Sequence, residues 1–98
     1  MGRYIARLGD DTYVDWSTVV DAPVSWVKDR AAAVIAWGED RVARADDNGT
    51  SILDGYPAGS TPEEIVSGNR AGPDETCITI GEIVAAYDEA NPAPWTVS

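Results

Sequence analysis

The chemistry open to this chain comes mainly from carboxylates. Seventeen Asp and Glu stand against seven Lys and Arg, with no His, so the formal charge is −10 over 98 residues. Without His the chain has no imidazole base near neutral pH and no imidazole metal ligand. It also cannot form the Ser-His-Asp or Cys-His arrangements of nucleophilic catalysis. A two-carboxylate glycosidase mechanism needs a deep cleft with one buried acid, which a core this small rarely provides. We therefore expect a non-enzymatic protein with no catalytic residues.

The acidic residues are concentrated in six adjacent pairs: Asp10-Asp11, Glu39-Asp40, Asp46-Asp47, Glu63-Glu64, Asp74-Glu75 and Asp88-Glu89. Most pairs fall in expected turns or first helical turns, where Asp and Glu are favoured, so solubility explains each pair separately. Together, paired carboxylates on a compact surface can imitate nucleic-acid phosphates and occupy a protein's nucleic-acid channel. On this hypothesis the partner is a basic protein, not a nucleic acid or a membrane. The binding face would comprise Asp10, Asp11, Glu39, Asp40, Asp46, Asp47, Asp88 and Glu89.

A glycine-bearing loop, residues 68–72, offers an alternative site. Its backbone N–H groups, with Asn69 and the Arg70 guanidinium, could cradle a phosphate. The loop lacks the Lys and the spacing of a P-loop, and a helix C-cap followed by a turn, with Arg70 paired to a carboxylate, also explains it. Converging arginines would indicate an oligomeric binder of a nucleotide-like anion. Arginines paired with acids would favour an interaction protein, and a structural or assembly accessory protein is a third possibility.

Metal and cofactor sites are not expected. A calcium loop starting at Asp46 would have Ser51 at its sixth position and Pro57 at its twelfth, where Gly and a bidentate Glu are needed. Cys77 is the only cysteine, so there is no intramolecular disulfide and no pair of thiolates for a metal. No apolar run approaches the roughly 20 residues that span a bilayer. The start of the chain lacks a hydrophobic signal core, which favours a cytoplasmic protein.

The elements that would position these groups follow from hydrophobic periodicity. Residues 3–8 and 12–20 alternate and flank a turn, which predicts an N-terminal hairpin that ends before Pro23. Asn48-Gly49, the preferred pair of a type I′ turn, predicts a second hairpin from residues 41–45 and 50–53. The alternative is that the preceding helix continues to about Ala45, because Gly38 interrupts a helix without forbidding it.

Three helices are expected. The first covers residues 26–37, capped by Ser25 and Gly38. Capping boxes at Thr61 and Thr79, each with Glu three residues later, begin helices that end near residue 67 and before Asn91-Pro92. A brief strand is expected at residues 76–78.

Together these elements predict an α+β fold in which a small antiparallel sheet of two hairpins packs against two to three helices on one face. A single domain would cover residues 1–91, followed by an irregular tail, 92–98, whose Trp95 is either packed or an exposed contact. The modest core of a chain this short leaves a homo-oligomer open. The expected core residues are Val14, Trp16, Val27, Val34, Ile35, Ile80, Ile83 and Val84.

Three segments, Tyr13 to Val24, Ala43 to Ser51 and Asn69 to Pro73, give the chain a family likeness. Together they resemble the small orphan accessory proteins of actinobacterial phages, over about a quarter of the chain. The resemblance carries no catalytic motif and assigns no functional residue. It implies a host-cell interior and a class rich in inhibitors of host or defence machinery. The expectation is a phage-encoded inhibitor that presents an acidic face to a basic host or defence protein.

Overall fold

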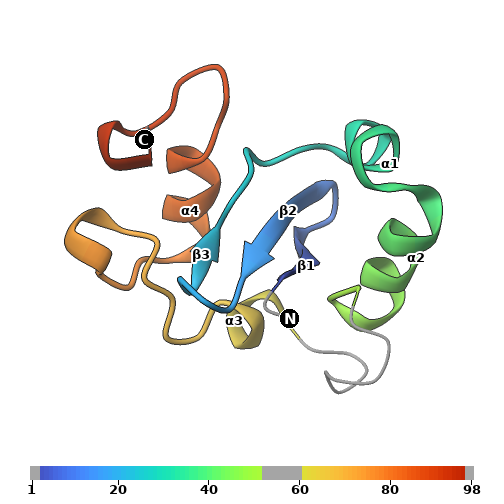
Figure 1. Ribbon diagram of the computed structural model, residues 1–98, viewed down its shortest axis with the longest axis horizontal. Helices are drawn as coiled ribbons and strands as arrows, with labels where there is room; N and C mark the ends of the chain where they lie inside the picture. The colour runs from blue at the N-terminus through green and yellow to red at the C-terminus, as the bar shows by residue number, and fades with distance from the viewer. Residues whose placement is uncertain (1–2, 52–60, 97–98) are drawn as a thin grey trace.

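A computed structural model of the chain describes residues 3–51 and 61–96. A three-stranded antiparallel sheet, in the order β1-β2-β3, lies between two groups of helices (Figure 1). Strands β1 (Arg3–Gly9) and β2 (Thr12–Ser17) form the N-terminal hairpin, with Tyr4 opposite Trp16. The predicted α+β fold and the first hairpin are confirmed.

Strand β2 is shorter than predicted, and Pro23, the residue expected to end the sheet, belongs to a third strand. A turn over residues 18–21 follows β2, and β3 (Ala22–Pro23) then returns along its edge. Pro23 lies opposite Trp16, while the neighbouring N–H of Val24 donates to the Asp15 carbonyl at 2.8 Å. The Pro23 position is therefore a non-hydrogen-bonded one, where a residue without an N–H costs the ladder nothing.

The predicted second hairpin is wrong, because residues 39–48 are helical. Helix α1 (Arg30–Trp37) ends at Gly38, and α2 (Glu39–Asn48) follows directly. Gly49 has φ 84° and donates its N–H to the Ala45 carbonyl at 2.8 Å, so Asn48-Gly49 ends a helix. A left-handed glycine serves equally in a type I′ turn and in a helix C-cap. The long-helix alternative was nearer, although Gly38, at φ 98°, separates two helices.

Residues beyond α2 extend the sheet at the other edge of β1. Thr50 lies opposite Ala6 in an isolated antiparallel bridge. The Arg7 N–H donates to the Gly49 carbonyl, and the Ser51 N–H donates to the Ile5 carbonyl, both at 2.9 Å. The segment predicted as the second strand of a hairpin therefore pairs with β1 instead of with residues 41–45. Residues 52 and 53 of that prediction lie outside the described residues.

Helix α1 begins four residues later than expected. Lys28 is still extended and exchanges both backbone hydrogen bonds with Tyr13, at 2.8 and 2.9 Å. The N-cap is Asp29, whose side chain accepts from the Ala32 N–H, while the Ser25 hydroxyl accepts from the Asp15 N–H. The prediction of Ser25 as the cap was wrong because this segment pairs with the sheet before the helix starts.

Both predicted capping boxes are present. Thr61 and Glu64 form reciprocal hydrogen bonds at the start of α3 (Pro62–Ile65). Thr79 and Glu82 form the same pair of bonds at the start of α4 (Ile80–Ala86). Bonds from Thr61 lower the pKa of the Glu64 carboxyl. Residues 76–78 form no strand and follow a 3₁₀ turn, η1 (Pro73–Glu75).

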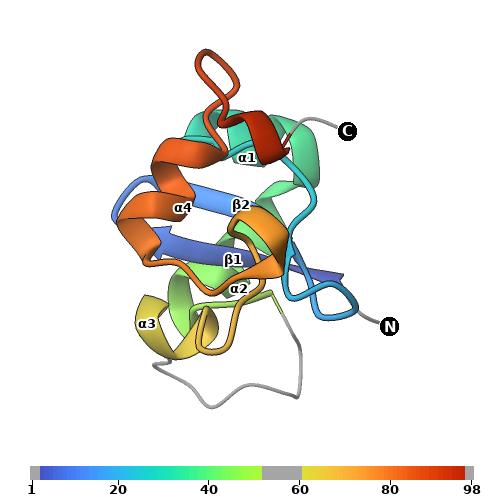
Figure 2. The ribbon, with the colours of Figure 1, turned by 90° about the vertical axis from the view of Figure 1, so that its left-hand side faces the viewer.

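The core lies on both faces of the sheet, not on one as predicted. Helices α3 and α4 cover one face and α1 and α2 the other; in Figure 2, α4 lies in front of the sheet and α1 behind it. On the first face the buried residues include Tyr4, Ala6, Leu8, Val14, Trp16, Ile65 and Ile83. On the second face they are Ile5, Tyr13, Ala33, Val42 and Ala45. The alternation of β1 therefore separates two apolar sets, one for each helical layer.

Three of the predicted core residues, Val14, Trp16 and Ile83, are confirmed as buried. Ile35 is wrong, because its side chain is 88% exposed. Helix α1 begins at Arg30 and turns Ala33 toward the sheet, which places Ile35 on the opposite side of the helix. The four remaining residues are half-buried: Val27, Val34, Ile80 and Val84.

The tail is anchored to the body of the protein. Residues Pro94–Thr96 form a 3₁₀ turn, η2, in the segment predicted to be irregular. The Ala93 N–H donates to the Ala86 carbonyl at 2.9 Å, and the Trp95 indole N–H donates to the Ala71 carbonyl at 2.8 Å. Trp95 is still 44% exposed. Trp95 is thus bonded to the body of the protein and still partly exposed.

Candidate functional site

Helix α2 carries four of the eight residues predicted for the acidic face. Residues seven apart lie two turns along the same side of a helix. Glu39 and Asp46 therefore form one line and Asp40 and Asp47 a second line beside it. The buried Val42 and Ala45 seat α2 against the sheet. Burial of the apolar stripe thus determines where the carboxylates point.

Arg30 at the start of α1 joins an acid of the hairpin tip to the acids of α2. The Arg30 guanidinium contacts Asp46 at 2.8 Å and Glu39 at 3.4 Å. The Arg30 backbone N–H donates to the Asp11 carboxylate at 2.8 Å. The bonds to Asp46, the larger cause, and to Glu39 raise the pKa of the Arg30 guanidinium. One arginine thus links three acidic residues from the hairpin tip and from α2.

Arg7 joins the same group from β1. Its guanidinium lies 3.7 Å from the Asp10 carboxylate and 3.8 Å from that of Asp46. The guanidiniums of Arg7 and Arg30 thus contact three predicted residues, Asp10, Glu39 and Asp46, and six of the eight predicted residues lie on the hairpin tip or on α2. We call them the acidic cluster: Asp10, Asp11, Glu39, Asp40, Asp46 and Asp47. With Arg41 and Arg44 of α2 counted beside Arg7 and Arg30, six carboxylates against four guanidiniums leave an excess of two negative charges.

Asp46 differs from the other five members of the cluster, which are exposed. Its carboxylate accepts a hydrogen bond from the hydroxyl of Tyr13, and the aromatic ring of Tyr13 is buried on the second face of the sheet. Burial works against the ionisation of Asp46, but hydrogen bonds from Tyr13 and Arg30 outweigh it and lower the pKa of the carboxyl. Burial and the bond to Asp46 in turn raise the pKa of the Tyr13 hydroxyl. Asp46 thus holds α2 to the sheet, and the other five carboxylates face solvent.

Asp88 and Glu89 are not part of the cluster. They follow α4, which packs on the face of the sheet opposite α2 (Figure 2). The Asp88 carboxylate accepts the Ala90 N–H at 3.0 Å, a local turn contact. Both residues are exposed and mark a separate, smaller acidic site at the end of α4.

The alternative ligand loop is used within the chain. Asn69 is only 2% exposed. Its amide nitrogen donates to the Val66 and Ile78 carbonyls at 2.9 and 2.7 Å, and its oxygen accepts the Ala71 and Ile78 N–H groups at 3.1 Å. Both donors and the acceptor oxygen are thus engaged. Residues 69–78 are held as a closed loop by this one side chain, which therefore has no free donor for a phosphate.

Arg70 is paired, as the alternative explanation of the loop requires. Its guanidinium contacts Glu75 at 3.0 Å, and its N–H donates to the Asp21 carbonyl at 2.7 Å. Arg3 pairs with the buried Asp15 at 2.5 Å. Arg7 and Arg30 are paired in the acidic cluster, so four arginines are paired with acids at three separate places. Arg44 instead donates to the Ser51 carbonyl at 3.2 Å.

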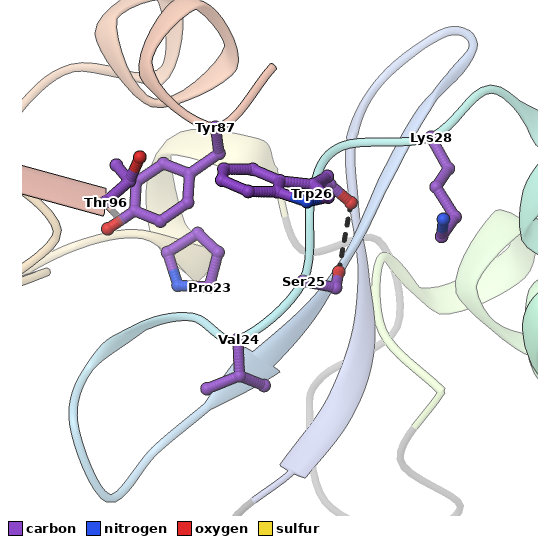
Figure 3. A pocket seen from close by; sticks show the side chains of 7 residues that line it. All are labelled: Pro23, Val24, Ser25, Trp26, Lys28, Tyr87 and Thr96. Carbon is purple, nitrogen blue, oxygen red and sulfur yellow. Dashed lines mark hydrogen bonds between the residues drawn. The ribbon is translucent and has the colours of Figure 1, made fainter. Parts of the chain in front are cut away.

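A groove that sequence reasoning missed lies beside β3 and the segment after it. Figure 3 shows the rings of Pro23, Trp26 and Tyr87 at one end and Lys28 at the other. The cavity volume is about 590 Å³, and the remaining lining residues are Val24, Ser25 and Thr96. This volume is within the range of ligand pockets. The lining comes from residues 23–28, 87 and 96, so no local sequence pattern indicates it.

Within residues 3–51 and 61–96, none of the helices combines the length and apolar character that crossing a bilayer would need. In the same residues no three His, Cys, Asp or Glu side chains are placed to hold a metal ion. No family model, no curated protein and no solved structure matches the chain.

Proposed function

We propose that this chain is a non-enzymatic interaction protein that presents the acidic cluster to a basic site on another protein, in place of a nucleic acid. The observation that carries the proposal is that six carboxylates lie on the hairpin tip and on α2, two elements that Arg7 and Arg30 join through ion pairs and a backbone hydrogen bond. The resemblance to phage accessory proteins supports a host or defence protein as the partner and inhibition as the outcome.

Electrostatics gives the cluster a role that scattered charges lack. Like charges held close together sum to a stronger local potential, which raises the encounter rate with a basic surface by ten- to a thousandfold. Five of the six carboxylates face solvent, so a partner can approach them without unfolding the chain. Arg7 and Arg30 offset part of the repulsion between the acids and hold the hairpin tip against α2. A basic nucleic-acid channel is the complementary surface.

The test compares two variants with the same net charge. The cluster variant removes five exposed charges and keeps Asp46: D10N, D11N, E39Q, D40N and D47N. The control removes five exposed acids from other parts of the structure: E63Q, D74N, E75Q, D88N and E89Q. Wild-type protein captures partners from a host lysate, and association with each purified partner is then measured for both variants.

We expect the cluster variant to associate at least roughly tenfold more slowly than the control variant, since steering depends on local charge. Wild-type affinity should fall steeply with added salt, and duplex DNA should compete for the partner. If both variants associate alike, or affinity is equal at low and high salt, the acids serve only solubility and the proposal fails.

A further inference from the structure

The groove of Figure 3 is lined by a single charged side chain, Lys28, which is also the only lysine in the sequence. Six ion pairs are present among the described residues, and the cation in each of them is an arginine. Lys28 therefore has no carboxylate partner in that part of the chain. A half-buried ammonium without an acidic partner can bond to an anion from outside the protein.

The position of Lys28 is fixed by the backbone. Lys28 exchanges both backbone hydrogen bonds with Tyr13, and the preceding Val27 N–H donates to the Tyr87 carbonyl at 2.9 Å. The Lys28 ammonium lies 5.9 Å from the centre of the Trp37 ring, close to the outer limit of roughly 6 Å for a cation–π contact. An ammonium has three N–H donors, so this contact leaves donors for a ligand. The groove is thus pre-formed, which lowers the entropy cost of binding.

The other polar side chains of the groove are already engaged. The hydroxyls of Ser25, Tyr87 and Thr96 donate to backbone carbonyls of the chain at 3.0, 2.9 and 2.7 Å. The Ser25 oxygen also accepts the Asp15 N–H at 3.0 Å. A ligand in the groove therefore meets one charged donor and otherwise packs on carbon.

The end of the groove away from Lys28 is made of rings. Figure 3 shows Pro23, Trp26 and Tyr87 there, and Trp26 is half-buried, so part of it remains open to a ligand. An aromatic ligand gains from offset or edge-to-face contact with such rings, beyond the area that it buries. Trp26 and Lys28 are two residues apart, so at most roughly 7 Å separates their Cα atoms. One small molecule can therefore contact both.

The acids that adjoin the groove in the sequence are used in local turns. Asp29 accepts the Ala32 N–H at 2.8 Å, and Asp88 accepts the Ala90 N–H at 3.0 Å. The overall charge of −10 repels anions at long range, but salt screens exposed charges beyond roughly 8 Å under physiological conditions. The charge that an anion meets on the groove lining is that of Lys28.

We propose that the groove binds a small aromatic carboxylate, with the ring packed on Trp26 and the carboxylate bonded to the Lys28 ammonium. Charge complementarity determines the sign of the ligand, and the rings determine its flat apolar body. The groove shares no residue with the acidic cluster, so this site does not depend on the proposed interaction with a basic protein.

The probe is cinnamate, added to ¹⁵N-labelled protein. We expect saturable NMR shifts at the Trp26 indole N–H and the Lys28 amide. Cinnamamide, which has the same flat body without the charge, should bind at least roughly tenfold more weakly, because a charge-assisted hydrogen bond is lost. Equal affinity of the two compounds, no saturable shift with cinnamate, or shifts centred on Arg44 or Arg70 would overturn the proposal.

Two substitutions with the same change in net charge locate the carboxylate. Lys28→Gln removes the cation of the groove, whereas Arg41→Gln removes a cation of α2 that does not line it. Lys28→Gln, with its fold checked by amide dispersion, should weaken cinnamate binding at least roughly tenfold and leave cinnamamide binding unchanged.

Arg41→Gln should change neither affinity, and Lys28→Arg, which keeps the positive charge, should retain most of the cinnamate affinity. An equal loss in the two glutamine variants would indicate a general effect of net charge and refute the site. Association of the acidic cluster with a basic partner is measured separately, so either proposal can fail without the other.

Discussion

The two faces of the β1–β2 hairpin are built differently. The first face, under α3 and α4, is an apolar core that includes Leu8, Val14 and Trp16. The second face, under α1 and α2, has a smaller apolar core whose border is ionic, where Tyr13 and Arg30 both bond to Asp46. Apolar burial attaches helices on both faces, but only the second face also positions charged groups.

This difference follows from the alternation of β1. Tyr4, Ala6 and Leu8 point to the first face, while Ile5 shares the second face with Arg7. A strand with apolar residues on both faces can hold two helical layers. The charged residue on one of them then requires a carboxylate partner, because an unpaired charge near a core is costly. Asp46 is a carboxylate partner of Arg7, and it is also a member of the acidic cluster. The same residue therefore contributes both to the packing of α2 and to the candidate binding surface.

The largest expected effect tests whether both faces carry the fold. Ile83→Ala on the first face and Ile5→Ala on the second each remove buried methylenes from a fully buried isoleucine. Each should lower the free energy of unfolding by about 2–5 kcal/mol, from lost transfer energy and a residual cavity. Urea denaturation of the two variants gives the comparison. A loss below about 1 kcal/mol for one of them would show that its helical layer packs loosely.

An intermediate effect distinguishes the ionic border of the second face. Asp46→Asn should lower stability at neutral pH by on the order of 1 kcal/mol, because it weakens hydrogen bonds to a charged group. Since the folded pKa of Asp46 is lowered, its contribution is full above the unfolded value of about 3.9 and is lost as pH falls through the folded value. The stability of variant and wild type should therefore converge below about pH 4.

Urea midpoints measured from pH 7 down to pH 2 check this prediction. Asp47→Asn, the exposed neighbour on α2, is the matched control and should change stability little at any pH. A constant difference in stability between Asp46→Asn and wild type across the whole pH range would contradict a lowered pKa of the Asp46 carboxyl in the folded state.

The smallest effect is expected where an ion pair lies outside both cores. Arg70 and Glu75 contact at 3.0 Å, but both side chains are more than half exposed. Arg70→Ala should lower stability by less than about 1 kcal/mol, because solvent screens exposed pairs. The same measurement on Arg30→Ala, which loses two acidic partners, should give a larger change. Equal changes would mean that the border of the second face is no stronger than an ordinary surface pair.

Local chemistry was enough to predict several elements from the sequence. The capping boxes at Thr61 and Thr79 are present because their bonds join residues three apart, within one helical turn. The N-terminal hairpin follows from two alternating runs around a short turn. The pairs of acids at residues 10–11, 39–40 and 46–47 were also recognised, as were the limits set by the absence of His.

Tertiary structure decided what local patterns leave ambiguous. Asn48-Gly49 suits a hairpin or a helix end, and the burial of Val42 and Ala45 against β1 selected the helix. The phase of α1 depends on pairing of residue 28 with the sheet, so Ile35 faces solvent. The bond from Tyr13 to Asp46 joins residues 33 apart, and the groove joins residues 23–28 to 87 and 96. Composition determined that the surface is acidic, whereas contacts between distant segments determined where the charges gather, because only folding sets those distances.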